Sequence, residues 1–486
     1  MIQRSAVRRL AQNTAWSFVA SLLARTANVI LFIVVSRLAG PGEAGILTIG
    51  FSYLAITGRF AAWGLDQILI RDVAKDTSQA GRYFVNLGLL RLLLASVSTF
   101  VLGTILGFGP YSVEVTHMIW LLLFNVWPEG IVDLSEAIFI AHERMSYVAI
   151  FGAITGIGKL VFGLLALFGG YGLTGVLWAI LLANVLAMLV SVVMAVGTFG
   201  LHRSSLDISF CKEQLKIAAP FVLIAGSYIL DNQADTIALS FQLSKDALGW
   251  YGAASALIVG ISLLPQAYRD AVFPTLSRAF VAGFKTLEYV YQRSMKYMLI
   301  AALPVTFGLM LIAQPILVLI YGERFSAATP ALQVLSIAAG MQFVMILQNR
   351  LLVIANQQRL LSVYILLGFI INVLGNFLFV PYLGIGGAAI ARVCSNLFVY
   401  ALSYRLINRV VHPFHLGTIW VRPLIAVIVM AGVVWLASGW MVIVRMILGT
   451  VAYGVVLLAL GTFSREELLA WSHILRGKKN EEGITL

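Results

Sequence analysis

The stretch FVASLLARTANVILFIVV, residues 18–35, is apolar enough to cross a membrane, yet it carries Arg25 near its middle. A helix needs about 20 mostly apolar residues to span the hydrocarbon core of a bilayer. A charged side chain at the centre of such a helix costs about 2.5–3.5 kcal/mol on insertion scales. Charges inside a membrane therefore face a water-filled cavity or a partner of opposite charge. Arg25 predicts one of these two arrangements.

Similar apolar segments recur along the whole chain. Of its 486 residues, 60% are hydrophobic and 11% are charged, whereas an average soluble domain has about 25% charged residues. We predict an all-α polytopic membrane protein with about fourteen transmembrane helices. The expected ranges are 14–38, 44–68, 82–108, 115–140, 146–168, 173–197, 214–240, 247–272, 294–320, 328–350, 360–380, 385–407, 419–438 and 441–462.

The net charge of +12 follows the predicted topology. Most of the Lys and Arg residues fall in the tails and in alternate loops, which places both termini in the cytoplasm by the positive-inside rule. The basic residues that fall on the outer side are Arg37, Lys245, Arg324 and Arg445. We therefore expect a multi-pass protein of the cytoplasmic (inner) membrane, and we expect no nucleic acid among its partners.

The chain also resembles itself at a spacing of 212 residues. GGYGLTGVLWAILLANVL (169–186) aligns with PYLGIGGAAIARVCSNLF (381–398). The aligned pairs are Gly172 with Gly384, Gly175 with Gly387, Ala179 with Ala391, and Asn184 with Asn396. Because this spacing holds an even number of predicted helices, the two copies keep the same orientation in the membrane. Such parallel repeats are typical of transporters, which bind their substrates at the repeat interface.

The repeat predicts two pseudo-symmetric lobes of six helices each. The first lobe, 1–200, holds helices 1–6, and the second, 210–410, holds helices 7–12. The remaining residues, 411–486, hold helices 13 and 14 and a cytoplasmic tail. We expect the substrate path to lie between the two lobes.

Four cations are predicted within the helices of the first lobe: Arg25, Arg59, Arg91 and Lys159. Three acids, Glu129, Asp133 and Glu136, share one face of helix 4. These acids could neutralise cations in structural salt bridges, and for Arg91, whose depth matches Asp133 or Glu136, we favour that interpretation. Arg25 has Asn28 one turn away on its own face, and there we favour a cavity.

A guanidinium matches phosphate oxygens with two parallel hydrogen bonds and stays charged at physiological pH. Cations in a cleft are therefore suited to an anionic group that passes through the protein. The predicted substrate-binding residues are Arg25, Asn28, Arg59, Arg91 and Lys159.

A second cluster is predicted in the second lobe. Asp231 and Asp235 share a face of helix 7, Asn372 and Asn376 share a face of helix 11, and Arg392 lies at a similar depth in helix 12. Carboxylate and amide oxygens could hold Na⁺ or carry a proton. An Asp235–Arg392 ion pair would instead complete the cluster internally, and we favour this pair or network.

Other chemistry finds little support. Cys211 and Cys394 suggest no disulfide framework or metal site. The chain has no nucleotide-binding domain and no long external loop to hold catalytic residues, so we expect no enzyme and no cofactor. Energy would come from an ion gradient, the membrane potential or the substrate gradient.

Five stretches resemble a known family. They are VSRLAGPGEAGILTIGFSYL (35–54), WGLDQILIRDVAKD (63–76), VFPTLSR (272–278), ILVLIYGERFSAATPALQVLSI (316–337) and YLGIGGAAIA (382–391). In order and spacing they resemble the oligosaccharide flippases of the polysaccharide biosynthesis (Wzx-type) family. That family belongs to the multidrug/oligosaccharidyl-lipid/polysaccharide superfamily of flippases.

The resemblance implies a flippase that moves a polyprenyl-pyrophosphate oligosaccharide from the inner to the outer leaflet for cell-surface polysaccharide synthesis. It implies a fold of two six-helix bundles, as in multidrug and toxin extrusion (MATE) proteins, that rock to give alternating access. Lipid II flippases of the superfamily place basic residues in the first lobe, which Arg25, Arg59 and Lys159 could match. Their sodium site could be matched by Asp235, Asn372 and Asn376, so Na⁺ is the one candidate metal ion. Arg392 departs from that pattern because its charge would compete with Na⁺.

Two alternatives stay open: a cation-coupled multidrug antiporter of the MATE type, and a membrane scaffold for glycan assembly that transports nothing. The expected partners are the lipid-linked oligosaccharide, membrane lipids, Na⁺ or H⁺, and a glycan polymerase or glycosyltransferases.

Overall fold

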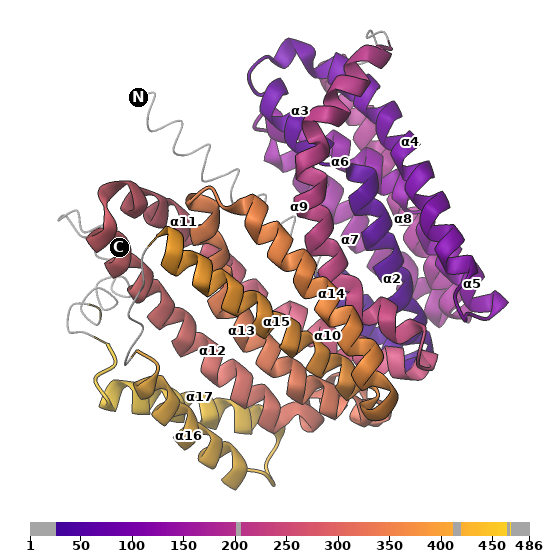
Figure 1. Ribbon diagram of the computed structural model, residues 1–486. Helices are drawn as coiled ribbons and strands as arrows, with labels where there is room; N and C mark the ends of the chain where they lie inside the picture. Colours follow the sequence, from indigo (N-terminus) through magenta and orange to yellow (C-terminus); the bar gives the residue numbers. More distant parts are fainter. Residues whose placement is uncertain (1–25, 201–205, 412–418, 464–466, 468–486) are drawn as a thin grey trace. The chain divides into compact units, whose positions relative to one another are not determined.

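A computed structural model describes residues 26–200, 206–411, 419–463 and 467. The described residues form helices and no strands (Figure 1). Among them, 11 helices are long and apolar enough to cross a membrane, and two shorter apolar helices are Thr26–Ala39 and Val421–Leu436. The prediction of an all-α polytopic membrane protein is confirmed, with fourteen as an approximate helix count.

The helices follow the predicted spans closely. After Thr26–Ala39 they are α2 (Pro41–Ala62), α3 (Leu65–Val73), α4 (Ala80–Gly107), α5 (Val113–Leu123), α6 (Val126–Ala141), α7 (Met145–Phe168), α8 (Gly172–Phe199), α9 (Ile208–Ser240), α10 (Lys245–Ile261), α11 (Leu263–Ala282), α12 (Phe284–Tyr321), α13 (Thr329–Ile354), α14 (Gln358–Leu383), α15 (Ile385–Val410), α16 (Val421–Leu436) and α17 (Val442–Ala459). Two short 3₁₀ turns, Thr77–Gln79 and Glu323–Ala328, lie between them.

The predicted helix 44–68 is interrupted near its end. Trp63 has φ 48° and Gly64 has φ 74°, a left-handed conformation that a continuous right-handed helix does not contain. The chain therefore ends α2 at Ala62 and starts α3 in a new direction. This turn brings Asp66, in the first turn of α3, toward the neighbouring helices.

The predicted helix 115–140 is divided between α5 and α6. Pro128 has no backbone N–H, and its ring clashes with the carbonyl four residues earlier in a continuous helix. That carbonyl belongs to Phe124, where the break falls. The Asn125 side chain donates its amide to the carbonyls of Leu121, at 3.3 Å, and Leu122, at 2.9 Å. The side chain thus gives a partner to the Leu121 carbonyl at the break, while the Leu122 carbonyl also accepts from the Asn125 backbone N–H at 2.9 Å.

The predicted helix 247–272 is likewise divided between α10 and α11, and α12 begins ten residues earlier than the predicted 294. Gly283, at φ 112°, separates α11 from α12. Residues 268–296 therefore belong to the end of α11 and the start of α12, which meet at this glycine.

The repeat has a counterpart in backbone conformation. Gly172 and Gly384 both have positive φ, 59° and 54°, and each stands at the start of a transmembrane helix, α8 and α15. A residue with a side chain is strained there, whereas glycine is not. The two aligned glycines thus make the same turn.

By contacts the chain divides into two compact units. Unit 1 comprises Met1–Ala256, Leu317–Ala331 and Gln358–Val399, and unit 2 comprises Leu257–Ile316, Leu332–Gln357 and Tyr400–Leu486. These units group helices by contact and not by the repeat, so the predicted lobes 1–200 and 210–410 stay a prediction.

The core of unit 1 is built by α3, α4, α6, α7 and α8. Leu65 and Leu69 of α3, Leu87 of α4 and Phe139 of α6 are fully buried in one cluster. Phe151 of α7 packs edge-on against Phe139 with ring centroids 5.5 Å apart. Within the same unit α9 packs against both α2 and α14.

In unit 2, α16 and α17 pack against each other and against α12 (Figure 1, the two yellow helices for the pair). The Tyr453 hydroxyl of α17 donates to the Ile300 carbonyl of α12 at 2.9 Å. Large apolar side chains stay exposed on helices of both units, such as Phe100 of α4 at 74% and Ile428 of α16 at 63%. Exposed apolar surface of this kind is suited to lipid.

Candidate functional site

The predicted cations of the first lobe differ in their surroundings. Arg25 lies outside the described residues. Asn28, on the helix Thr26–Ala39, and Arg59, in the last turn of α2, are exposed. Within the described part of the chain neither has a hydrogen bond or an ion pair. A cluster of charged residues lies on α3, α4 and α6 of the same unit.

Arg91 is the centre of that cluster. It lies on α4, is only 2% exposed, and contacts Asp66 of α3 through Nη1 and Asp133 of α6 through Nη2, the latter at 2.5 Å. Gly130 of α6 lets the arginine approach, because a Cβ there would lie 3.1 Å from Nε of Arg91. The favoured interpretation of Arg91 as one half of an ion pair therefore agrees with the geometry. The two ion pairs of Arg91 join α3, α4 and α6.

Lys159 of α7 is also paired. Its Nζ lies 3.0 Å from Oε1 of Glu129, and the same oxygen accepts from Nδ2 of Asn184 at 2.9 Å. Asn184, which is fully buried on α8, also donates to Oδ1 of Asn125 at 2.6 Å. This polar chain links α6, α7 and α8 inside unit 1.

The charged residues that the structure describes in this region do not carry a net positive charge. Glu136 of α6 has no ion pair or hydrogen bond among the described residues. The cations are Arg59, Arg91 and Lys159, and the acids are Asp66, Glu129, Asp133 and Glu136. Arg91 and Lys159 already face carboxylates, so Arg59 is the cation of this set that is free to bind an added anion.

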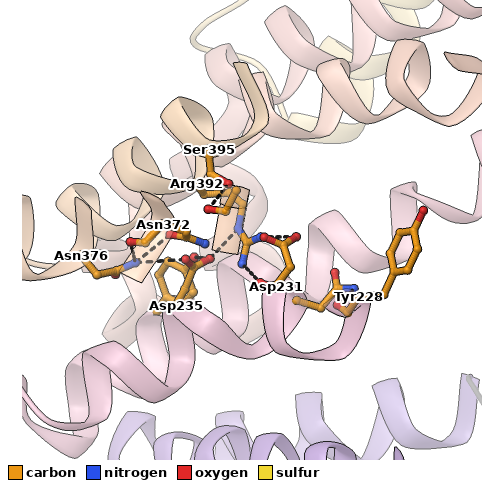
Figure 2. A network of polar contacts seen from close by, with 10 residues as sticks. Tyr228, Asp231, Asp235, Asn372, Asn376, Arg392 and Ser395 are labelled. Atoms are coloured by element: carbon orange, nitrogen blue, oxygen red, sulfur yellow. Dashed lines mark hydrogen bonds and ion pairs between the residues drawn. The ribbon is translucent and has the colours of Figure 1, made fainter. Parts of the chain in front are cut away.

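The second cluster is a closed network in unit 1 (Figure 2). Arg392 of α15 donates from Nε to Oδ2 of Asp235 at 2.8 Å. Its Nη1 donates to Oδ2 of Asp231 at 3.0 Å, and its Nη2 donates to the Asp231 carbonyl at 2.5 Å. The Tyr251 hydroxyl of α10 donates to Oδ2 of Asp235 at 2.6 Å. The favoured Asp235–Arg392 pair thus agrees with the geometry and extends to Asp231.

The two asparagines of α14 complete the network. Nδ2 of Asn376 lies 3.3 Å from Oδ1 of Asp235 and 2.8 Å from both the carbonyl and Oδ1 of Asn372. Asp235 is 4% exposed, and both asparagines are fully buried. Nδ2 of Asn372 and Oδ1 of Asn376 have no partner. The three oxygens therefore surround an amide nitrogen.

Whether a sodium ion would fit this network depends on the kind of oxygen atoms that it offers. Carboxylate, carbonyl and amide oxygens suit a hard cation, and turning the Asn376 amide over would add its unpaired Oδ1 to the set. The donors therefore fit Na⁺ in kind. Arg392 supplies a positive charge to the same carboxylates, so Na⁺ would add a second cation to the cluster.

Sequence reasoning missed several members of these clusters. Asp66 lies in one of the stretches that resemble the family, and the sequence did not identify it as a partner of Arg91. An acidic side chain beside an apolar helix is nevertheless a signal that could have indicated an ion pair. Tyr251 gave no signal, because a tyrosine in an apolar helix is ordinary. Among the described residues, no group of three or more His, Cys, Asp or Glu side chains could hold a metal ion.

A family model described as "Polysaccharide biosynthesis protein" matches residues 10–280, which is more than half of the chain. The chain belongs to this family, as the resemblance implied. It is 23% identical to "Probable flippase AglR" of Haloferax volcanii over 95% of this chain and 98% of that protein. It is 22% identical to "Lipopolysaccharide biosynthesis protein WzxC" of Escherichia coli over 76% of this chain and 74% of that protein.

Solved structures share the fold. The lipid II flippase MurJ in an inward closed conformation has a TM-score of 0.75 at 14% identity, over 90% of this chain and 97% of that one. An inward-facing multidrug resistance MATE transporter has a TM-score of 0.64 at 16% identity, over 81% and 98%. The predicted fold of the multidrug/oligosaccharidyl-lipid/polysaccharide superfamily is confirmed.

Proposed function

We propose that this protein translocates an oligosaccharide linked to polyprenyl pyrophosphate from the inner to the outer leaflet, by alternating access, for cell-surface polysaccharide synthesis. Its family membership and the relative named as a probable flippase, matched over almost the full length, support the proposal. Two relatives that are named as flippases support a transporter and not an enzyme. The protein would lie in the cytoplasmic membrane with both termini in the cytoplasm.

The observation that carries the substrate proposal is the state of Arg59. It is exposed, on a membrane-spanning helix, and without an ion pair in the described part of unit 1. An arginine in this position is costly unless it meets water or an anion. Arg59 would bind the pyrophosphate through its two-pronged donors, together with Arg25 and Asn28. Arg91 and Lys159 would help to shape the cavity while they remain in their ion pairs with carboxylates.

The membrane potential is the proposed energy source. Moving one elementary charge across 100 mV is worth about 2.3 kcal/mol, and an inside-negative potential favours the outward movement of an anion. The Arg392 network supports this proposal because Arg392 already pairs with both carboxylates of the second cluster without an added ion. Coupling to Na⁺ or H⁺ and association with a glycan polymerase or glycosyltransferases stay predictions.

The test is leaflet exposure of a fluorescent polyprenyl-pyrophosphate oligosaccharide in reconstituted vesicles. Arg59→Ala should lower the rate by at least about tenfold, which corresponds to losing about 1.4 kcal/mol of transition-state binding. Arg278→Ala, at an exposed arginine of α11, is the matched control and should flip at the wild-type rate. Equal rates for Arg59→Ala and the wild type would contradict the assignment of Arg59.

One observation favours a second candidate, the MATE-type antiporter. Glu136 has no partner in the described part of the chain, and the side chain of Asp133 is 54% exposed despite its contact with Arg91. Carboxylates inside a membrane protein that are exposed, as Asp133 is, or half-buried, as Glu136 is, could bind an organic cation. Vesicles that extrude a lipophilic cation in exchange for Na⁺ or H⁺, but flip no glycan lipid, would establish this alternative. Vesicles that do neither would favour the scaffold.

A further inference from the structure

A buried carboxylate lies beyond the last transmembrane helix of unit 2. Glu467 is only 5% exposed, and three donors of α12 hold it. Its Oε1 accepts from the Tyr297 hydroxyl at 2.6 Å and lies 3.4 Å from Nε of Arg293. Its Oε2 accepts from Nζ of Lys296 at 3.0 Å. Both carboxylate oxygens are therefore bound by side chains of one helix.

The three donors share one face of α12. Arg293, Lys296 and Tyr297 are spaced i, i+3 and i+4, and side chains at these spacings are neighbours on a helix. We call them the α12 triad. The side chains of Arg293 and Lys296 keep 28% and 21% of their surface exposed, whereas the side chain of Glu467 keeps 6%. The triad is thus open at its edge, although its occupant is buried.

Other contacts hold the two cations in place without the carboxylate. Nη1 of Arg293 donates to the Tyr289 hydroxyl at 3.1 Å. Nζ of Lys296 lies 5.6 Å from the ring centroid of Phe463 and 5.7 Å from that of Tyr297. An ammonium group within about 6 Å of an aromatic ring is attracted to its face. The triad therefore keeps its donors positioned if Glu467 leaves.

The occupant does not neutralise the site. Arg293 and Lys296 carry two positive charges, and Glu467 carries one negative charge. The acid nearest to them along α12, Glu288, accepts from Gln292 at 3.2 Å and forms no ion pair with a residue that the structure describes. The triad with Glu467 thus keeps one positive charge in excess, which favours an anion.

The position of the triad along α12 is suited to a lipid headgroup. In the proposed topology α12 ends on the outer side at Tyr321. Lys296 lies about 37 Å from Tyr321 along the helix, at 1.5 Å per residue, whereas the hydrocarbon core is about 30 Å thick. The triad therefore lies at the level of the headgroups of the inner leaflet.

The donors of the triad also suit a phosphate group. Guanidinium and ammonium groups are the cations that proteins use to bind phosphate oxygens, and a phenol hydroxyl adds a third donor. The cytoplasmic leaflet carries anionic lipids, and basic pockets at that level bind their headgroups. A carboxylate with both oxygens engaged by such donors occupies the place that a phosphate would take.

We propose that Arg293, Lys296 and Tyr297 form a binding site for the phosphate of an anionic phospholipid of the inner leaflet, and that Glu467 occupies this site as an internal competitor. Binding of the lipid releases Glu467 from α12. The inference rests on the topology given with the proposed function, and it does not depend on which substrate is transported.

Thermal unfolding of the purified full chain in detergent, with a short-chain phosphatidylglycerol added in increasing amounts, tests the site. A ligand that binds only the folded state raises the unfolding temperature. Glu467→Gln removes the charge of the competitor and keeps its shape. The lipid concentration that gives half of the rise should fall by about tenfold, because the apparent affinity scales with the fraction of sites that are free. Adding Lys296→Gln should reverse this gain.

Lys285→Gln is the matched control, because Lys285 is an exposed lysine of the same helix. Added to Glu467→Gln, it should leave the half-rise concentration unchanged. The same half-rise concentration in the wild type and in Glu467→Gln would overturn the proposal. Equal effects of Lys285→Gln and Lys296→Gln would also overturn it, since the lipid would then respond to overall charge. Each variant is compared with its own lipid-free temperature, so a lower baseline does not obscure the result.

Two further ligands distinguish the source of the phosphate. Phosphatidylcholine of the same chain length has no net charge and should give a smaller rise than phosphatidylglycerol. Inorganic phosphate at the same concentration should give none, because it lacks the chains that hold the lipid at this depth. A rise with inorganic phosphate equal to that with phosphatidylglycerol would contradict a lipid as the ligand.

Native mass spectrometry provides a readout that does not involve unfolding. After purification from vesicles that contain phosphatidylglycerol, Glu467→Gln should retain more of this lipid than the wild type, and Lys296→Gln should retain less. Equal retention by all three proteins would overturn the proposal. Flipping of a glycan lipid is not measured in either experiment, so the site and the proposed transport function can fail separately.

Discussion

Arg91 is a cation removed almost wholly from solvent, at 2% exposure, with carboxylates of two other helices against its guanidinium. The desolvation of such a charge is tolerable only while its partners are present. Removing one member of a buried ion pair leaves an uncompensated charge and typically costs 3–5 kcal/mol. We therefore expect the loss of Arg91 to act on the stability of the fold, and the loss of exposed Arg59 to act on substrate binding.

We expect Arg91→Ala to lower the thermal unfolding temperature in detergent clearly, because it removes the buried cation that joins α4 to α3 and α6. Asp66 and Asp133 would face each other without a cation between them. Differential scanning fluorimetry of purified protein measures the effect. Arg59→Ala, which breaks no ion pair in the described part of the chain, should stay near the wild-type temperature. Equal losses in the two variants would contradict the distinction.

Arg392 is expected to act as a built-in counter-ion for Asp231 and Asp235. The wild type should therefore unfold at the same temperature in NaCl and in KCl of equal concentration. Arg392→Gln leaves two carboxylates beside the Asn372 and Asn376 oxygens, and a ligand that binds only the folded state stabilises it. We expect this variant to be stabilised by Na⁺ over K⁺. A sodium-specific rise in the wild type would show that the network binds the ion itself.

The ion pairs show what sequence can predict at this scale. Helix depth alone predicts that Arg91 pairs with Asp133 or Glu136 and that Asp235 pairs with Arg392, because buried charges require partners. Helix depth could not decide whether Asp133 or Glu136 is the partner of Arg91. It also could not identify Asp66 as a partner, because the left-handed turn at Trp63 and Gly64 decides where Asp66 lies. Tyr251 reaches Asp235 only through the packing of α10 on α9.

At the scale of the element, the spans were predictable and their interruptions were not. Apolar length marks a membrane segment regardless of where its backbone bends. The break at Phe124 depends on Pro128 together with an asparagine that satisfies the freed carbonyls. The start of α12 at Phe284 depends on one positive φ at Gly283. Such local conformations leave hydropathy unchanged.

The start of α9 depends on Asp207, which lies outside the membrane-spanning segments. Its Oδ1 accepts from the Phe210 N–H at 3.0 Å and its Oδ2 from Arg82 at 2.8 Å. The Phe210 N–H first, and then Arg82, hold the pKa of this carboxyl below its usual value. The Asp207 N–H also donates to Oδ1 of Asn86 at 2.6 Å. The start of α9 is thus fixed to α4.

A lowered pKa in the folded state means that Asp207 stabilises the fold above its unfolded pKa, about 3.9. This contribution should be lost as the pH falls through the lower folded value. We expect the wild type to lose more stability than Asp207→Asn between about pH 5 and pH 2. Unfolding temperatures at matched ionic strength measure the difference. Parallel curves for the two proteins would show that Asp207 carries no such contribution.

At the scale of the whole molecule, the proposal joins a fixed cation, a second cluster whose two carboxylates both pair with Arg392, and a membrane potential. The charge that crosses belongs to the substrate: Arg59 would meet a pyrophosphate, and the Arg392 network needs no incoming ion. The family and fold were predictable because turn motifs recur in order along the chain. The state of each cation was not, since it depends on which helices meet.

The most direct measurement of this account is the flipping rate of a polyprenyl-pyrophosphate oligosaccharide in vesicles at zero and at inside-negative potential, with no Na⁺ or proton gradient. The same glycan on an uncharged lipid is the control. The account predicts flipping of the pyrophosphate form, accelerated by the inside-negative potential, because about 2.3 kcal/mol per charge is gained across 100 mV. Flipping that ignores the potential, or that favours the uncharged lipid, would contradict it.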